Sequence, residues 1–438
     1  MISADLQRAC ARVETARLGR QEGRVVRVSG LVVEASGIPS PVGTLCDLHT
    51  SQGVVTAEVV GFAEGRTRLM PLEHSPGIAP NDRVLLRAGT IRVPVGPSVL
   101  GRVLDGFGRP IDGRGPLVAP TRSVAGSPPN PLGRRRIDTN LTTGVRAIDA
   151  FTTVGRGQRV GIFAGSGVGK STLLGQIVRR SQADATVVAL VGERGREVRE
   201  FLEETLGTEG RERSALVVAT SDAPPLMRLR AASVAVTIAE GFRQQGLDVL
   251  LVVDSLTRFA AAQREIGLAA GEPPTTRGYP PSVYTELPKL LERLGCGEEG
   301  SITALLTVLV EGDDMNDPVA DCVRSILDGH IVLTRALAER NRYPAIDVLA
   351  SVSRTMPRTT TPEHRDLAGE ARRLLASYEA ARDLIEVGAY KPGASKALDR
   401  AVTLQPRLIE FLRQGSEDFS ELEQTLERLQ ALLKGGKG

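Results

Sequence analysis

The chain has 438 residues, which is more than one hydrophobic core usually serves, so two or three domains are expected. Hydrophobic residues make up 41% and charged residues 24%, a globular composition, and the formal net charge of +3 demands no nucleic-acid partner. The four cysteines stand far apart with no C-x-x-C pair, which argues against a disulfide framework or a zinc site. No apolar run approaches the roughly 20 residues of a membrane span, and the N-terminus lacks a signal-peptide core. We therefore expect a soluble, cytoplasmic protein.

The N-terminal fifth of the chain divides into a helical stretch and a strand-rich stretch. Residues 1–20 can form an amphipathic helix, because Ser3 is a suitable N-cap and Leu6, Cys10 and Val13 recur on one face. That face either packs on the next domain or binds a partner protein, and both interpretations stay open. Residues 21–95 carry short alternating runs between Gly and Pro turns, such as GRVVRVSGLVVEAS and GVVTAEVVGF. Half-buried strands of this kind predict a small β-barrel.

The rest of the chain predicts an α/β core followed by a helical domain. Within residues 96–360, continuous apolar runs such as RVGIFAG, TVVALVGE, VLLVVDS and ITALLTVLVEG alternate with helical segments. Apolar runs without alternation are typical of parallel strands that are covered on both faces. Residues 361–438 are rich in Leu, Ala, Glu and Arg and predict helices. We therefore expect an α/β fold with a P-loop core, an N-terminal barrel and a C-terminal α-helical domain.

A phosphate-binding loop is predicted at residues 163–176, FAGSGVGKSTLLGQ. It follows an apolar strand and opens a helix, which is the context that binding of a triphosphate needs. Gly165, Gly167 and Gly169 let the backbone approach the phosphates, Lys170 supplies a cation, and Ser171 supplies a hydroxyl for Mg²⁺. Ala164 replaces the first glycine of the usual pattern, which is acceptable at a strand end if its φ is negative.

Two acidic positions at strand ends suggest that the bound nucleotide is hydrolysed. Asp254 ends the apolar strand VLLVVDS and is the expected Walker B carboxylate that holds Mg²⁺ through water. The strand ending in VGERGRE places Glu193, Arg194 and Glu197 at the carboxyl edge of the sheet, where open α/β sheets bind ligands. A carboxylate at position 193 can orient and polarise the attacking water. The alternative is that Glu193 is a solvated loop residue.

Longer motifs resemble a known family. PAIDVLASVSR, residues 344–354, is similar to the signature of the nucleotide-binding subunits of rotary ATP synthases. RGYPPSVYTELPKLLERLG and TVLVEGDDMNDPVADCVRSILDGHIVLTR resemble the flagellar protein-export ATPases and the related type III secretion ATPases more than they resemble synthase catalytic subunits. The resemblance covers nearly the whole chain and is weakest over the first 20 residues. Ala164 is usual in these export enzymes.

The resemblance implies roles for particular residues of this chain. Glu193 becomes the base that polarises water, with Arg194 and Glu197 supporting it, and Arg354 becomes an arginine finger that reaches the neighbouring subunit's site; the alternative for Arg354 is an ordinary surface arginine. Tyr343 would stack on adenine, with a core aromatic as the alternative. The nucleotide is ATP with Mg²⁺. The implied ATP-binding set is Gly165, Ser166, Gly167, Val168, Gly169, Lys170, Ser171, Thr172 and Tyr343, and the implied metal set is Ser171, Asp254 and Glu197.

The resemblance also implies an assembly and its partners. It implies a ring of six identical chains at the inner face of the cytoplasmic membrane, peripherally attached. Partners would be a regulatory, stator-like protein at the N-terminus, export-gate and central-stalk proteins, and export substrates bound to chaperones. Independently of the family, one chain carries Lys170, Glu193, Asp254 and Arg354 together, so a homo-oligomer with equivalent active interfaces follows.

Other functions remain as alternatives. A ring-shaped RNA translocase also combines a small barrel with this kind of core, but residues 1–100 contain a single aromatic residue, Phe62, and no basic cluster. Single-stranded nucleic acid needs aromatic stacking platforms and a basic groove, so no nucleic-acid partner is expected. A purely regulatory nucleotide binder would be expected to lack the acid at position 193. The ATPase of a virulence-type secretion system, and a synthase-type catalytic subunit, remain alternatives to flagellar export.

Overall fold

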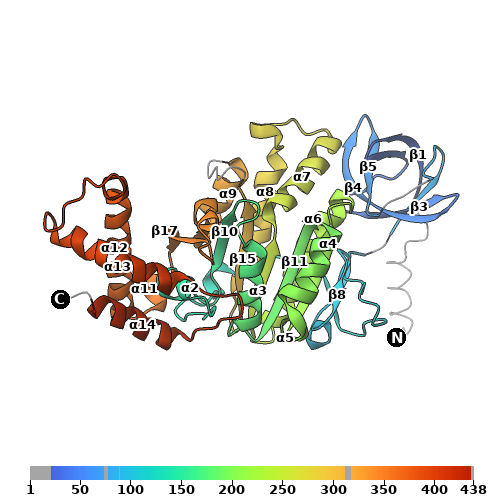
Figure 1. Ribbon diagram of the computed structural model, residues 1–438. Coiled ribbons are helices and arrows are strands. Elements are labelled where there is room, and N and C mark those ends of the chain that lie inside the picture. Colours follow the sequence, from blue (N-terminus) through green and yellow to red (C-terminus); the bar gives the residue numbers. More distant parts are fainter. Residues whose placement is uncertain (1–20, 74–76, 88, 311–316, 436–438) are drawn as a thin grey trace. The chain divides into compact units, whose positions relative to one another are not determined.

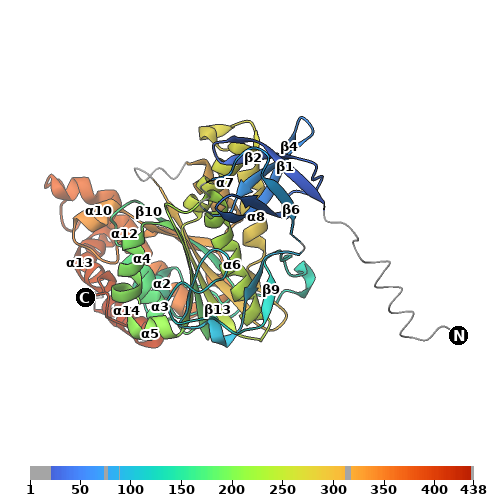
Figure 2. The same cartoon turned by 90° about the vertical axis from the view of Figure 1, so that its right-hand side faces the viewer.

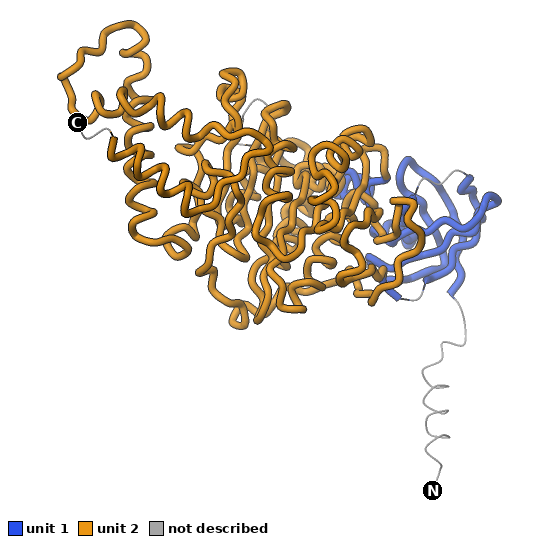
Figure 3. The backbone as a smooth tube through the Cα atoms, turned by 60° about the horizontal axis from the view of Figure 1, so that its bottom comes forward, with its two compact units in different colours: residues 1–90, 224–226, 265–272 blue, residues 91–223, 227–264, 273–438 orange. Residues whose placement is uncertain are grey.

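The structure, a computed structural model, describes residues 21–73, 77–87, 89–310 and 317–435 (Figure 1). The proposed N-terminal helix at 1–20 lies outside these residues. The chain forms two compact units, coloured separately in Figure 3. The first takes the residues up to Thr90 together with Pro224–Leu226 and Glu265–Glu272, and the second takes the remainder. The domain limits expected at 95/96 and 360/361 stay predictions.

The first unit contains the expected β-barrel. Its six strands close in the order β1-β2-β5-β4-β3-β6, and all neighbouring pairs are antiparallel. Alternate residues such as Val33, Leu48 and Leu69 point inward and are at most 1% exposed. The strands are β1 (Glu22–Ser29), β2 (Val32–Ser36), β3 (Leu45–Thr50), β4 (Gly53–Ala63), β5 (Arg66–Pro71) and β6 (Arg83–Leu86).

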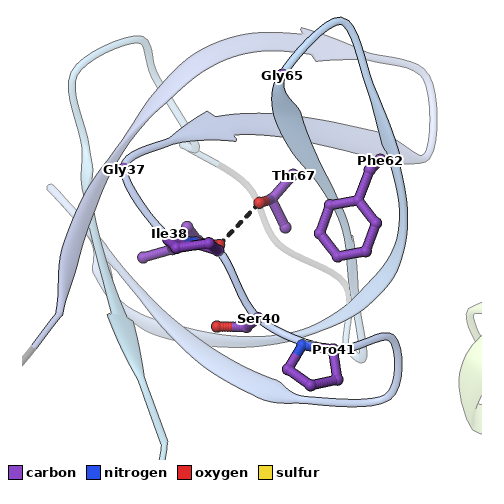
Figure 4. A pocket seen from close by; sticks show the side chains of 8 residues that line it. Gly37, Ile38, Ser40, Pro41, Phe62, Gly65 and Thr67 are labelled. Carbon is purple, nitrogen blue, oxygen red and sulfur yellow. Dashed lines mark hydrogen bonds between the residues drawn. The ribbon is translucent and has the colours of Figure 1, made fainter.

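A pocket of about 490 Å³ opens on this barrel (Figure 4). Its lining is mostly apolar and backbone, with Ile38, Pro41 and Phe62 around it, and Thr67 Oγ1 closes one side by donating to the Ile38 carbonyl at 2.8 Å. Phe62 is 53% exposed at its rim. The lining includes none of the residues expected to bind nucleotide.

The second unit is built on a nine-stranded sheet whose main path runs β17-β16-β10-β15-β13-β11-β12-β8. The strands from β16 to β8 along this path are parallel to their neighbours, whereas β17 is antiparallel to β16 and β14 to β15. A separate pair joins β7 to β9. The strands are β7 (Arg92–Pro94), β8 (Val103–Leu104), β9 (Thr121–Ser123), β10 (Arg159–Ala164), β11 (Ala185–Glu193), β12 (Ser214–Thr220), β13 (Asp248–Asp254), β14 (Gly295–Cys296), β15 (Ser301–Leu309), β16 (Gly329–Leu333) and β17 (Ile346–Ser353).

Helices cover both faces of this sheet (Figures 1 and 2), which explains why its strands read as continuous apolar runs. Val188 and Leu190 face a core shared with α2, α3 and the C-terminal helices, whereas Val187 and Ala189 face a core shared with α6 to α9. The α-helices are α2 (Arg146–Phe151), α3 (Lys170–Arg180), α4 (Gly195–Glu200), α5 (Gly207–Glu212), α6 (Pro225–Arg243), α7 (Leu256–Ala270), α8 (Pro281–Glu292), α9 (Pro318–Ile326), α10 (Arg335–Glu339), α11 (Met356–Thr359), α12 (Pro362–Glu386), α13 (Lys396–Leu412) and α14 (Leu422–Lys434). Short turns of other helix types are η1 (Pro97–Val99), η2 (Pro131–Gly133), η3 (Phe201–Thr205) and η4 (Thr276–Gly278).

The C-terminal region is helical, as expected, and packs on the same core as α2 and α3. Thr361 caps α12 by accepting from the His364 amide, and Ser395 caps α13 by accepting from the Leu398 amide. The turn that joins α12 to α13 exposes apolar side chains, with Leu384 55% and Val387 76% exposed. Among the described helices, none combines the length and the apolar character that crossing a bilayer requires.

Candidate active site

The loop between β10 and α3 has the geometry that a phosphate cradle requires. Ala164 is the last residue of β10 and has an extended backbone. This conformation does not require a glycine, so the alanine is acceptable here. Gly167 and Gly169 have φ of 79° and 86°, a left-handed conformation that favours glycine. Gly169 is the N-cap of α3, so the first amides of this 11-residue helix face the loop together with Ser171 in its first turn. A Cβ on Gly167 would meet nothing within 4 Å, so the space beside the loop is open.

Two carboxylates and the loop lysine meet at the carboxyl edge of the sheet. β11 ends at Glu193 and β13 ends at Asp254, and the two strands are parallel neighbours. Lys170 Nζ donates to Asp254 Oδ1 and lies 3.8 Å from Glu193 Oε1. Asp254 Oδ1 also accepts from the Thr307 hydroxyl of β15 at 2.7 Å. Lys170, Asp254 and Glu193 therefore form one cluster, at the edge of the sheet where the sequence placed them.

Glu193 is electrostatically suited to bind and release a proton. Burial, hydrogen bonding with Glu197 and the charge of Asp254 raise its pKa to about 7, against the opposing charges of Lys170 and Arg258. The side chain is buried, and its Oε1 has no hydrogen-bond partner among the residues that the structure describes. A buried carboxylate oxygen without a partner is costly unless it serves a ligand, and a water molecule held for attack on a phosphate is such a ligand. These features favour the base over the solvated loop residue.

Arg194 and Glu197 lie at the start of α4, next to Glu193. The Arg194 side chain is 73% exposed and its Nη1 is 3.5 Å from Glu197 Oε1. Hydrogen bonding with Glu193, followed by the charges of nearby arginines, lowers the pKa of Glu197. Glu197 therefore interacts with Glu193 directly, whereas Arg194 contacts Glu197 and has no described contact with Glu193.

Arg258 belongs to the same cluster and was missed by the sequence analysis. Its Nη1 lies 3.0 Å from Glu193 Oε2 and also donates to the Gly192 carbonyl. The residue is in the first turn of α7, four positions after Asp254. A basic residue one turn into the helix that follows the Walker B strand was the signal that could have identified it.

The residues present fit ATP with Mg²⁺. The open cradle, the Ser171 hydroxyl, the Asp254 carboxylate and the orphaned oxygen of Glu193 supply what a magnesium triphosphate and its attacking water require. Within the described part of the chain, no group of three or more His, Cys, Asp or Glu side chains could hold a metal ion by itself. Mg²⁺ characteristically keeps several waters and binds through one or two carboxylates plus substrate phosphates, which matches this set.

Tyr343 lies beside the cradle. A Cβ on Gly169 would be 3.4 Å from two carbons of its ring, and the side chain is 42% exposed. The Tyr343 carbonyl accepts from the amide of Gln414, whose side chain in turn donates to the Gly144 carbonyl. The half-exposed ring is thus available to stack on a base, on a segment held by the C-terminal region.

Arg354, in contrast, lies at the opposite end of the parallel strands. β10 pairs with β16 through Gly161 and His330, and β16 pairs with the antiparallel β17 through Gly329 and Ser353. Arg354 therefore follows β17 at the amino end of β10, whereas the phosphate cradle is at the carboxyl end. The six residues of β10 span about 17–20 Å, at roughly 3.3 Å per residue. The side chain of Arg354 cannot reach the cradle of its own chain.

Comparisons with known proteins identify the family of the chain. Residues 144–353 match the nucleotide-binding domain of the ATP synthase alpha/beta family, residues 25–86 match the beta-barrel domain of that family, and residues 360–431 match the T3SS EscN ATPase C-terminal domain. The flagellum-specific ATP synthase of Bacillus subtilis is 53% identical over 94% of this chain and 95% of its own length. The type 3 secretion system ATPase of Xanthomonas euvesicatoria is 49% identical over 98% of this chain and 97% of its own.

The fold agrees as well. The assembled ATPase EscN of the enteropathogenic E. coli type III secretion system superposes with a TM-score of 0.89 at 46% identity, covering 94% of this chain and all of EscN. EscN in complex with its central stalk EscO gives a TM-score of 0.86. The chain is therefore an ATPase of the ATP synthase alpha/beta family, within the group formed by the flagellum-specific ATP synthases and the type 3 secretion system ATPases.

Proposed function

We propose that this protein is the ATP-hydrolysing motor of a flagellar type III protein-export apparatus, which releases substrates from chaperones and delivers them for export. The observation that carries the hydrolytic part is the cluster in which Lys170, Asp254 and Glu193 meet beside an open phosphate cradle. The flagellar relative described above is somewhat more similar than the virulence-type one, which favours flagellar export over an injectisome.

The chemistry divides among the residues of the cluster. Lys170 leaves Asp254 to pair with the β- and γ-phosphates of ATP. Ser171 and Asp254 would hold Mg²⁺, which would supply positive charge beside the transferred phosphoryl group. Glu193, in its ionised form, accepts a proton from the attacking water, and Arg258 fixes its orientation. Tyr343 stacks on the adenine. We keep Glu197 and Arg194 as supporting residues, since Arg194 pairs with Glu197 and Glu197 interacts with Glu193. Glu197 also remains a proposed metal-binding residue beside Ser171 and Asp254.

Arg354 completes the site of a neighbouring chain. Its exposure and its distance from its own cradle support a role in trans, and the assembled state of EscN supports an oligomer, for which we propose a homohexamer. Each chain then presents a cradle at one interface and a finger at the other, which is the heterologous arrangement that closes a ring.

The remaining proposals concern partners and location. EscN's complex with its central stalk supports a stalk protein as a partner. We propose that it binds at the end of α12, where Leu384 and Val387 are exposed and suit an apolar surface. A stator-like protein at residues 1–20, export-gate proteins and chaperone-bound substrates are proposed from the family. We also propose a cytoplasmic location with peripheral attachment to the membrane, and no nucleic-acid partner.

The experiment mixes Arg354→Ala chains with Glu193→Gln chains, each nearly inactive alone. In equal mixtures, about one interface in four joins an intact Glu193 to an intact Arg354, so activity returns in part. Co-assembly is verified by purification through two different tags. If co-assembled mixtures stay at the single-variant level, Arg354 does not act across the interface. If Glu193→Gln alone hydrolyses ATP normally, the site assignment itself is wrong.

A further inference from the structure

The backbone at Arg354 is held firmly, while its side chain is exposed. The Arg354 amide donates to the Asp328 carbonyl at 3.0 Å. Among the described residues, no hydrogen-bond or ion-pair partner is recorded for its guanidinium. A group that must act on a neighbour's phosphate needs this combination, because the base of the side chain is fixed and its tip stays available.

A buried glutamine that directly precedes β10 is bonded to the residues around Arg354. Gln158 is 0% exposed. Its Nε2 donates to the Asp328 carbonyl at 3.0 Å and to Ser353 Oγ at 3.1 Å. Its Oε1 accepts from Thr355 Oγ1 at 2.6 Å and from the Gly155 amide at 2.8 Å. The amide therefore uses both donors and both acceptor positions, and it binds the two chain neighbours of Arg354 together with the carbonyl that Arg354 itself uses.

The backbone around the Gln158 side chain is closely packed. A Cβ on Gly329 would lie 3.0 Å from Gln158 Nε2 and 2.6 Å from the Val352 carbonyl, so only glycine allows this approach. Asp328 is fixed in turn, since Arg159 Nε and the Arg159 amide each donate to its Oδ2 at 3.0 Å. The Ser353 hydroxyl donates to the Thr153 carbonyl at 2.8 Å, which leaves its oxygen to accept from Gln158. The polar groups on both sides of residue 354 are thus joined in one hydrogen-bonded network.

We propose that Gln158 is a positioning residue for Arg354 and acts through it on the active site of the adjacent chain. This inference rests on the proposed function, in which Arg354 acts in trans. Without the amide, the Ser353 and Thr355 hydroxyls and the Asp328 carbonyl lose a common partner, and the chain at residue 354 is free to shift. A shift of about 1 Å in a catalytic group can lower turnover about 100-fold.

The first test is Gln158→Ala in the full chain. We expect kcat for ATP to fall about 10- to 100-fold while KM and nucleotide affinity stay within about threefold, because the variant's own cradle is untouched. Gln263→Ala is the matched control, since Gln263 is also a buried glutamine but bonds to Ser282 on α8. A wild-type kcat for Gln158→Ala, or an equal loss in the control, would overturn the proposal.

Mixed assemblies of two variants distinguish positioning of Arg354 in trans from damage to the variant's own active site. Gln158→Ala chains mixed with Glu193→Gln chains should regain activity to the same fraction as Arg354→Ala chains do with the same partner. If the Arg354→Ala mixture recovers and the Gln158→Ala mixture does not, Gln158 serves its own chain and the inference fails alone. If the Arg354→Ala mixture does not regain activity, Arg354 does not act across the interface, and the inference about Gln158 is wrong as well.

A second pair of variants tests the same hydrogen bond if Gln158→Ala does not fold. Thr355→Val removes the hydroxyl that donates to Gln158 Oε1, whereas Thr355→Ser keeps it. We expect a severalfold fall in kcat for the valine variant, unchanged KM, and near-complete rescue by serine. Equal kcat values for the two variants would contradict the role of this hydrogen bond, and hence of Gln158.

Discussion

Thr307 offers the sharpest test of how the metal carboxylate is held. Its hydroxyl is fully buried on β15 and lies 2.7 Å from Asp254 Oδ1, the oxygen that Lys170 also contacts. The Val253 carbonyl is a second possible acceptor at 3.2 Å, but the hydroxyl has one proton and the shorter bond to a carboxylate is the stronger. Thr307→Val removes this donor with little change of shape.

The size of the expected loss of activity follows from the charge of the acceptor, the Asp254 carboxylate. A hydrogen bond to a charged group contributes about 1.5–3 kcal/mol, and about 1.4 kcal/mol corresponds to a factor of ten. Without nucleotide, Asp254 keeps Lys170 and the loss is partly offset. With nucleotide bound, Lys170 turns to the phosphates and the carboxylate depends on Thr307 alone at that oxygen. We therefore expect about a 10- to 100-fold loss of kcat/KM for magnesium ATP in Thr307→Val.

The assay is steady-state ATP hydrolysis over a range of Mg²⁺ concentrations. Thr307→Ser keeps the hydroxyl and should stay near wild type, and thermal unfolding of all three proteins checks that the fold is intact. The half-saturating Mg²⁺ concentration should rise in the valine variant alone. If the valine and serine variants have the same magnesium dependence, Thr307 does not orient Asp254 and the reasoning is refuted.

Four further predictions address the cluster itself. Lys170→Ala should abolish tight ATP binding in equilibrium titrations, because the β- and γ-phosphates lose their cation; unchanged affinity would contradict the cradle. Glu193→Gln should bind ATP in the same titrations but lose turnover, since the shape is kept and the base removed. In the wild type, kcat/KM should rise with pH to a plateau with a midpoint near 7, because the ionised form of Glu193 is the active one and its pKa is raised to about 7. Glu197→Gln should move that midpoint to lower pH, since hydrogen bonding with Glu197 helps to raise this pKa, and a midpoint that stays in place would exclude the coupling.

The parts that sequence predicted well are those encoded by neighbouring residues. The phosphate loop is a contiguous strand, turn and helix, so Gly167, Gly169 and Lys170 reveal it through backbone freedom and charge alone. Asp254 and Glu193 end apolar strands, and the rule that parallel strands end at one edge was enough to bring them together. The same local signals predicted the barrel, the α/β core and the C-terminal helices.

The parts that were missed depend on pairing between distant segments. Gln158 bonds to Ser353 across 195 positions, and only the order β17-β16-β10 brings them together. Thr307 bonds to Asp254 because β15 is the neighbour of β13, which no local pattern states. Tyr343 was predicted to lie near the nucleotide only through the family motif, whereas its contact with Gly169 follows from the antiparallel return of β17.

That antiparallel return also underlies the proposal that Arg354 acts on the site of a neighbouring chain. Because β17 runs opposite to β16, the segment that begins at the cradle beside Tyr343 ends at Arg354 on the far edge of the sheet. A parallel β17 would have ended at the cradle edge and placed Arg354 within reach of its own nucleotide. β10 spans both edges, with the phosphate loop after Ala164 and Gln158 just before Arg159. β10 therefore lies between the phosphate loop and the position of Arg354. If Arg354 acts in trans, as proposed, this one strand connects the two parts that a chain contributes to two different sites, and hydrolysis then requires assembly.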